Sequence, residues 1–276
     1  MEYLRERPYI GVTGVSTPSE ASAIAQIFVD EGLTNKQNNH VGMIGVLADQ
    51  RSFIPRAGER IKYPTLDQIR QIFKVTQGKA FNTLHYHTYR ESDLTQQLEQ
   101  LLDRSRLYSD RLCDGVQLNL RWPPIDEVEK TKKTFPDLKI ILQLGPSVLT
   151  EGPEDIVTKL TPYVDLIDYA LIDPSGGRNR VFQINTVAPL HNQIREAHPD
   201  LPLAFAGGFN TRNVRTRLWV LLQTVATSNF GIDAEGGLRV QSEQGSLTPI
   251  SINRARGYIR NAALFFRAIE KEESPT

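Results

Sequence analysis

The chain has 276 residues, of which 39% are hydrophobic and 23% are charged, and both values are close to those of average globular proteins. This composition excludes a disordered chain and a coiled coil, and the length suits a single α/β barrel. Lys and Arg together number 32, as do Asp and Glu, so no excess charge favours nucleic acid or an anionic membrane as a partner.

The sequence carries no sign of export or membrane insertion. The first seven residues are rich in charged side chains and no long apolar run follows them. No stretch approaches the roughly 20 apolar residues of a membrane helix. Cys113 is the only cysteine, so an internal disulfide cannot form. We therefore expect a cytoplasmic protein without a nucleic-acid or membrane partner, and the sequence leaves open whether it forms a homo-oligomer.

Short β-branched apolar runs alternate with longer amphipathic segments along the chain, which is typical of repeated βα units around a parallel sheet. The predicted strands are 9–15, 41–47, 80–86, 115–120, 139–144, 166–172, 202–206 and 230–234. The predicted helices are 21–31, 66–76, 94–107, 125–134, 154–160, 186–197, 214–227 and 252–269. Eight units predict a single (β/α)8 TIM barrel over residues 1–270, with a polar tail at 271–276, and argue against an open doubly wound sheet.

Two short segments have the composition of helix starts. Thr17-Pro18-Ser19-Glu20 and Pro64-Thr65 combine a hydroxyl that can cap free amides with a proline that the first turn tolerates. The connection 48–65 is the longest irregular stretch, and in a barrel it would lie over the mouth where βα loops gather.

Paired glycines follow the last two predicted strands. Gly207 and Gly208 come after the seventh strand, and Gly236 and Gly237 come after the eighth. One such pair alone favours a tight turn, but two pairs in these loops favour a phosphate site, since glycine lets backbone amides approach an anion closely. Loops after strands seven and eight are the usual phosphate site of this fold, so we predict a phosphorylated small-molecule ligand.

Several polar residues at strand ends are candidate site residues. Tyr169, Leu171 and Asp173 share one strand face, which places Asp173 at the barrel mouth, although Asp-Pro-Ser-Gly-Gly is also good turn chemistry. Asp233 is as well suited to anchoring a loop as to binding a ligand. His85 and His87 also share a face, but no third ligand is recognisable, so we expect no metal.

Five segments occur in the order of one family's motifs: 11–16 (GVTGVS) with Glu20-Ala21, 115–119 (GVQLN), 171–173 (LID) with 175–177 (SGG), 206–210 (AGGFN) with Asn213-Val214, and 231–233 (GID). They resemble, in turn, the K-x-C-G-[IL]-T, G-V-Q-L-H, L-L-D, A-G-G-L-x-x-x-N-V and G-V-D segments of the phosphoribosylanthranilate isomerases of tryptophan biosynthesis. The resemblance spans nearly the whole chain.

This resemblance implies an Amadori-type isomerisation of a phosphorylated sugar without cofactor or metal, in which a general acid opens the sugar ring and a general base removes the proton from C2. It implies that Asp173 is the acid and that Thr13 stands at the position of the base. Arg60, or alternatively Arg56, matches the arginine that receives the anthranilate carboxylate. Asn119 stands where the family has histidine.

The chain departs from the family pattern at the base position, because Thr13 replaces a cysteine and an unactivated hydroxyl cannot accept a proton as a thiolate does. Gly11 replaces the preceding lysine, Glu235-Gly236 replaces paired serines, and Arg239 replaces a glutamate. A second hypothesis is therefore a pseudoenzyme that binds a phosphorylated ligand without turnover.

A third hypothesis is an aldol or lyase reaction with a base recruited from Asp49, His85 or Glu235, the last of which stands beside the predicted phosphate loop. Imine chemistry is disfavoured, because Lys139, the only lysine in a predicted strand, opens the fifth strand at the opposite end of the barrel.

Overall fold

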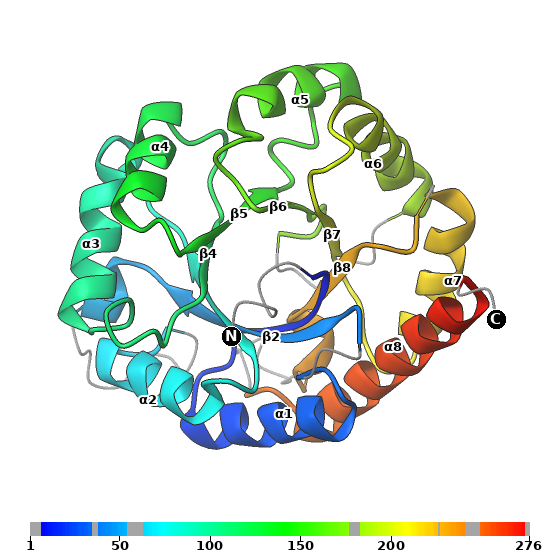
Figure 1. Cartoon of the computed structure of the whole chain (residues 1–276), viewed down its shortest axis with the longest axis horizontal. Helices are drawn as coiled ribbons and strands as arrows, with labels where there is room; N and C mark the ends of the chain where they lie inside the picture. Colours follow the sequence, from blue (N-terminus) through cyan, green and yellow to red (C-terminus); the bar gives the residue numbers. More distant parts are fainter. Residues whose placement is uncertain are drawn as a thin grey trace.

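The computed structural model describes residues 7–34, 38–53, 63–176, 183–225, 227–240 and 249–273. Within these residues, eight parallel strands pair in chain order and the last pairs with the first, so that the sheet closes into a barrel. Figure 1 shows the strands at the centre and the helices in a ring around them. The prediction of a single (β/α)8 barrel is confirmed.

The strands of the barrel are β1 (Tyr9–Thr13), β2 (Val41–Ala48), β3 (Phe81–Tyr86), β4 (Gly115–Leu118), β5 (Lys139–Leu144), β6 (Tyr169–Ile172), β7 (Leu203–Ala206) and β8 (Gly231–Ala234). The outer helices are α1 (Pro18–Asp30), α2 (Leu66–Thr76), α3 (Leu94–Arg104), α4 (Ile125–Thr134), α5 (Pro153–Leu160), α6 (Ile184–Ala197), α7 (Val214–Thr224) and α8 (Ile252–Glu273). None of these helices, in the ranges described, is long and apolar enough to cross a membrane.

Element ends differ from the predictions where buried apolar residues continue past the regular backbone. β6 begins at Tyr169, because Leu166 and Ile167 lie in the turn after η4 (Thr161–Tyr163) and pack against the core from there. α3 ends at Arg104, since Arg106 has a positive φ of 55° and the amide of Leu107 bonds back to the carbonyl oxygen of Leu102. Such a left-handed residue is a common helix terminator.

Both predicted helix starts are confirmed as capping boxes. The Thr17 hydroxyl accepts from the backbone amide of Glu20 at 3.2 Å, and the Thr65 hydroxyl accepts from that of Gln68 at 3.4 Å. In each case the side chain of the third residue bonds back to the cap amide. These reciprocal bonds use amides that have no partner within the helix.

The inside of the barrel is apolar at the amino ends of the strands and polar at the carboxyl ends. Tyr9, Phe81 and Tyr169, each the first residue of its strand, contact one another with ring centroids 5.5 to 6.4 Å apart. They belong to an inner cluster separate from the larger core between strands and helices. These aromatic side chains occupy the barrel interior at the amino ends of the strands, so the part of the interior left for a ligand is at the carboxyl ends.

Candidate functional site

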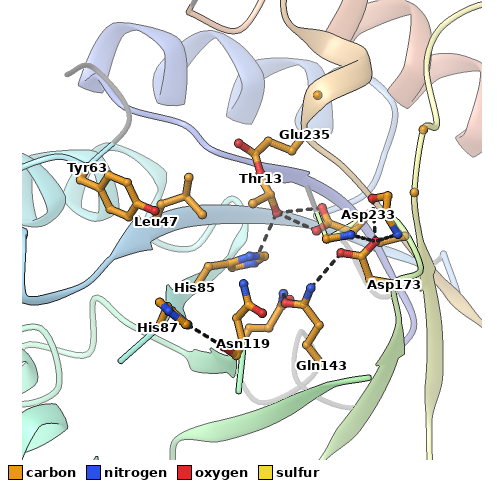
Figure 2. Close-up of a pocket in the computed structure, with 17 residues that line it drawn as sticks. Thr13, Leu47, Tyr63, His85, His87, Asn119, Gln143, Asp173, Asp233 and Glu235 are labelled. Atoms are coloured by element: carbon orange, nitrogen blue, oxygen red, sulfur yellow. Dashed lines mark hydrogen bonds between the residues drawn. The ribbon is translucent and has the colours of Figure 1, made fainter. Parts of the chain in front are cut away.

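A pocket lies at the carboxyl ends of the strands, where successive inward side chains are polar (Figure 2). Strand alternation explains its lining, because every second residue of each strand faces the barrel interior. The described residues that line the pocket are Thr13, Leu47, Tyr63, His85, His87, Gln117, Asn119, Gln143, Asp173, Ser175, Gly176, Ala206, Gly207, Gly208, Asp233, Glu235 and Gly236.

Asp173 follows β6 and both anchors a turn and lines the pocket. Its Oδ1 accepts from the amide and hydroxyl of Ser175 at 3.0 and 2.7 Å and from the amide of Gly176 at 3.2 Å. Its Oδ2 accepts from Gln143 at 2.8 Å, and Gln143 accepts in turn from Gln117 at 2.9 Å. The two interpretations of this aspartate are therefore compatible, since the turn holds its carboxylate at the pocket wall.

Thr13 and Asp233 meet inside the pocket. The Thr13 hydroxyl lies 2.8 Å from both carboxylate oxygens of Asp233 and 3.3 Å from Nε2 of His85. Burial, followed by the charges of Asp173 and Glu235, raises the pKa of Asp233 from 3.8 to about 7, although the Thr13 hydrogen bond opposes the rise. Burial lowers the pKa of His85 to about 3, so this imidazole is neutral at physiological pH.

The two glycine pairs bring the loops after β7 and β8 together. Gly207 and Gly208 have φ values of 119° and 68°, a region that side chains with a Cβ rarely adopt. A Cβ on Gly237 would lie 2.1 Å from the carbonyl oxygen of Phe209, so the backbones of the two loops are in direct contact there. Gly207, Gly208 and Gly236 line the pocket, while Gly237 packs behind it.

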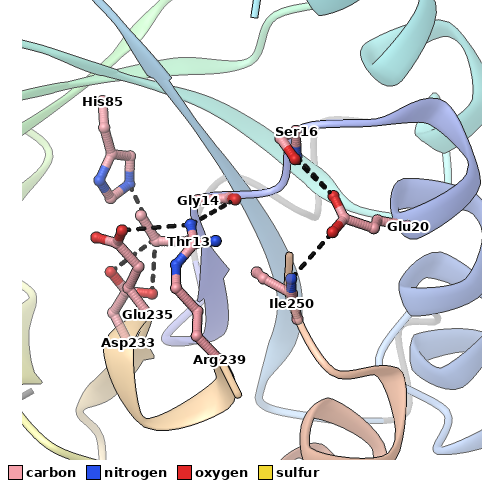
Figure 3. A network of polar contacts seen from close by, with 9 residues as sticks. All are labelled: Thr13, Gly14, Ser16, Glu20, His85, Asp233, Glu235, Arg239 and Ile250. Atoms are coloured by element: carbon pink, nitrogen blue, oxygen red, sulfur yellow. Dashed lines mark hydrogen bonds and ion pairs between the residues drawn. The ribbon is translucent and has the colours of Figure 1, made fainter. Parts of the chain in front are cut away.

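Glu235 stands beside this corner with its charge partly balanced. Its Oε1 lies 3.4 Å from Nη2 of Arg239, and the same Nη2 donates to the carbonyl oxygen of Gly14 at 2.8 Å (Figure 3). Gly14 has a φ of 83°, and a Cβ there would lie 2.1 Å from this guanidinium nitrogen. The pairing reduces the repulsion that the glutamate would otherwise exert on an anion.

The pocket brings together most of the residues predicted from sequence, which are Thr13, Asn119, Asp173, Gly207, Gly208, Asp233, Glu235 and Gly236. Arg60 and its alternative Arg56 lie outside the described residues. Asp49 is buried but is not among the described residues of the pocket wall.

Gln117 and Gln143 were not predicted as site residues, although their inward positions on β4 and β5 follow from strand alternation.

The two histidines of β3 and the loop after it make different contacts. His85 approaches Thr13, whereas Nδ1 of His87 lies 2.9 Å from the carbonyl oxygen of Asn119. Within the described parts of the chain, no three His, Cys, Asp or Glu side chains come together so as to hold a metal ion.

No protein-family model matches the sequence, and no curated protein matches it. Among solved structures, the phosphoribosyl anthranilate isomerase of Thermus thermophilus is similar with a TM-score of 0.57 at 13% identity, over 95% of this chain and 99% of that one. The enzyme of the same name from Thermotoga maritima gives 0.57 at 16% identity, over 93% and 98%. Tryptophan synthase subunit alpha from Legionella pneumophila gives 0.60 at 13% identity, over 95% and 92%.

The fold and the pocket define a TIM barrel with a polar cavity at the carboxyl ends of its strands. Its fold is similar to that of the phosphoribosylanthranilate isomerases and of tryptophan synthase alpha subunits. At identities of 13 to 16% these similarities concern the fold, which hosts many unrelated reactions.

Proposed function

We propose that the protein is an isomerase-like enzyme that acts on a phosphorylated sugar by an aldose-to-ketose or Amadori-type rearrangement, in its specific form a phosphoribosylanthranilate isomerase. The observation that carries the proposal is one pocket in which two carboxyl groups, Asp173 and Asp233, lie beside the paired glycines after β7 and β8. Proton transfer at adjacent carbons needs such titratable groups. The loops that carry Gly207, Gly208 and Gly236, which we call the glycine corner, offer backbone amides to phosphate.

The electrostatics of the pocket restrict how phosphate would be bound. The described lining includes Asp173, Asp233 and Glu235 but neither lysine nor arginine. Backbone amides, rather than a lysine or arginine of this lining, would therefore hold the phosphate, while Arg239 offsets the charge of Glu235. The raised pKa of Asp233 is consistent with this, because a protonated carboxyl repels an anion less.

A second candidate function is ligand binding without turnover. Thr13 favours it, because Thr13 stands where the isomerase motif has the cysteine that acts as general base. A threonine hydroxyl cannot serve as a base at neutral pH. An aldolase that works through an imine is not favoured. Lys139 pairs with Asp168 at 2.9 Å at the amino end of β5, on the side of the barrel away from the pocket.

The test is an assay of the purified protein for the loss of phosphoribosylanthranilate fluorescence. We expect turnover that falls at least about 100-fold in Asp173→Asn, the loss typical of a missing acid or base. Asp126→Asn is the matched control, since Asp126 is exposed on α4 and is not among the residues that line the pocket. Absence of turnover in folded protein, together with measurable binding of the substrate, would instead support the non-catalytic alternative.

A further inference from the structure

Two departures from the isomerase motif act on the same carboxyl group. Gly11 pairs with Asp233 across the β1–β8 seam, and a Cβ on Gly11 would lie 2.6 Å from Oδ1 of Asp233. Two residues further along β1, the Thr13 hydroxyl reaches both oxygens of the same carboxylate. Gly11, which replaces the lysine of the motif, thus makes room for Asp233. Thr13, which replaces the cysteine, forms a hydrogen bond with it.

Thr13 also contacts His85, and the absence of a side chain at Gly45 leaves the space for this contact. A Cβ on Gly45 would lie 2.5 Å from Oγ1 of Thr13 and 2.7 Å from Nε2 of His85. Because a hydroxyl has one proton, Thr13 can donate to an ionised Asp233 and accept from His85, or accept from a protonated Asp233 and donate to the other tautomer of His85. The chain of three residues accommodates both protonation states of the carboxyl group.

We propose that Asp233 is the base that takes the proton from C2 of the ligand and returns it to C1, and that Thr13 and His85 are positioning residues that orient it. Asp173 keeps the separate part of the acid in ring opening. The assignment rests on the proposed isomerisation. Asp173 is the less suitable base for the C2 proton, because three of the four hydrogen bonds to its carboxylate come from Ser175 and Gly176 of its own turn. Asp233 is held by Thr13 and the backbone of Ala234, and it faces the pocket.

The surroundings of Asp233 explain its readiness to exchange a proton. Burial disfavours its charge, and a pKa of about 7 leaves both forms populated at neutral pH, which is the condition under which one group can take a proton and return it. The neutral imidazole of His85 supplies no charge to oppose this. The titratable groups that interact electrostatically with the Asp233 carboxyl are Asp173, Glu235, Tyr9 and Tyr258.

The proposed step conserves atoms and electrons. The ionised carboxylate of Asp233 forms an O–H bond with the proton on C2 of the ring-opened iminium, the C–H electron pair becomes a C1=C2 bond, and the electrons of C1=N pass to nitrogen. The same carboxyl then returns the proton to C1 while the C2 hydroxyl loses its proton to water and becomes a carbonyl. That released proton balances the one taken up by the ring oxygen on ring opening.

The test is a pH titration of the aspartate carboxyl carbons by ¹³C NMR in protein labelled at that position. We expect one carboxyl to titrate near neutral pH and its signal to be absent from Asp233→Asn. Thr13→Val removes the hydrogen bond that lowers this pKa, so the titration should move to higher pH, whereas Thr13→Ser should leave it nearly unchanged. Glu235→Gln removes a neighbouring negative charge and should move it to lower pH even if Thr13→Val does not fold.

The kinetic readout is the pH profile of kcat in the isomerase assay. Asp233→Asn should lower kcat at least about 100-fold, Thr13→Ser should retain it within about threefold, and Glu235→Gln should shift the acidic limb, where Asp233 becomes protonated and inactive as a base, in the same direction as the NMR titration. An Asp233 that titrates in the ordinary acidic range, or an active Asp233→Asn enzyme, would overturn the assignment.

Inorganic phosphate separates this assignment from the proposed function. An anion bound at the glycine corner should raise the pKa of Asp233 further, because a nearby negative charge disfavours ionisation of the carboxyl group. A near-neutral titration without any response to phosphate, in protein that also lacks isomerase activity, would count against the phosphorylated-sugar function. In that case the Asp233 titration, and its response to Thr13→Val, would still report that the carboxyl is a poised proton carrier.

Discussion

At the scale of single residues, the buried carboxyl of Asp233 couples the chemistry of the pocket to the stability of the barrel. Its pKa is about 7 in the folded protein against an ordinary value of 3.8, so the folded state binds the proton more tightly than the unfolded chain does. The stability that this proton contributes is present below pH 4 and is lost as the pH rises through 7, at about 1.4 kcal/mol per pH unit.

His85 acts in the opposite direction. Its pKa falls from 6.5 to about 3 on folding, so its contribution to stability is present above pH 6.5 and is lost as the pH falls toward 3. The effects of Asp233 and His85 oppose each other between about pH 4 and 6.5. A stability profile of the unaltered protein therefore does not isolate either group.

Comparison with Asp233→Asn isolates the carboxyl, because asparagine resembles the protonated form. We expect the variant to gain roughly 2 to 3 kcal/mol in unfolding free energy relative to the unaltered protein between pH 5 and pH 8. Urea denaturation at several pH values measures the difference. Parallel profiles for the two proteins would mean that Asp233 titrates alike in the folded and unfolded states.

At the scale of elements, Glu20 joins the start of α1 to two other segments. Its Oε2 accepts from the amide and hydroxyl of Ser16 and from the amide of Thr17, at 2.9 to 3.1 Å. Its Oε1 accepts from the amide of Ile250, just before α8, at 3.0 Å (Figure 3). One buried side chain therefore holds the β1–α1 turn, which carries Gly14 beside the pocket, and the segment that leads into the last helix.

We expect Glu20→Ala to destabilise the protein by about 2 to 4 kcal/mol, because it leaves several buried amides without an acceptor. Thr65→Ala is the comparison, since its capping box lies at the surface and a lost cap costs about 1 kcal/mol. Thermal and urea unfolding of both variants give the two values. Equal losses would show that the bond from Ile250 adds nothing to an ordinary cap.

At the scale of the whole molecule, the barrel divides into a polar end that carries the pocket and an opposite end that maintains the structure. Asp168 marks the second end, where it accepts from Lys132 at 2.7 Å, from Lys139 at 2.9 Å and from the amide of Ile140 at 2.9 Å. In (β/α)8 barrels, the residues that carry out chemistry and the residues that stabilise the fold commonly lie at opposite ends of the barrel.

The division predicts that Asp168→Asn lowers the unfolding free energy by about 1 to 2 kcal/mol through the loss of two ion pairs. The same change should leave the NMR titration of Asp233 and the response to phosphate unaltered. Denaturation curves and the titration on one protein sample measure both quantities. A shifted Asp233 titration would show that the two ends are coupled through the aromatic layer between them.

Much of this architecture could be predicted from the sequence, because the signals that specify it are local. Alternating apolar runs and amphipathic segments define eight βα units, and the hydroxyls of Thr17 and Thr65 mark helix starts within four residues of their partners. The glycine pairs and Asp173 are recognisable for the same reason, since each begins within two residues of the end of a strand at the barrel mouth.

Only the tertiary structure decided which of these residues act on one another. Thr13 and Asp233 are 220 residues apart and meet because β8 closes on β1, and the space for their contact exists because Gly11 and Gly45 lack side chains. The pKa of Asp233 likewise depends on burial and on charges from other strands, which local sequence does not encode. The sequence by itself determined the barrel and the end that carries the pocket, and barrel closure decided which carboxyl is placed to carry a proton.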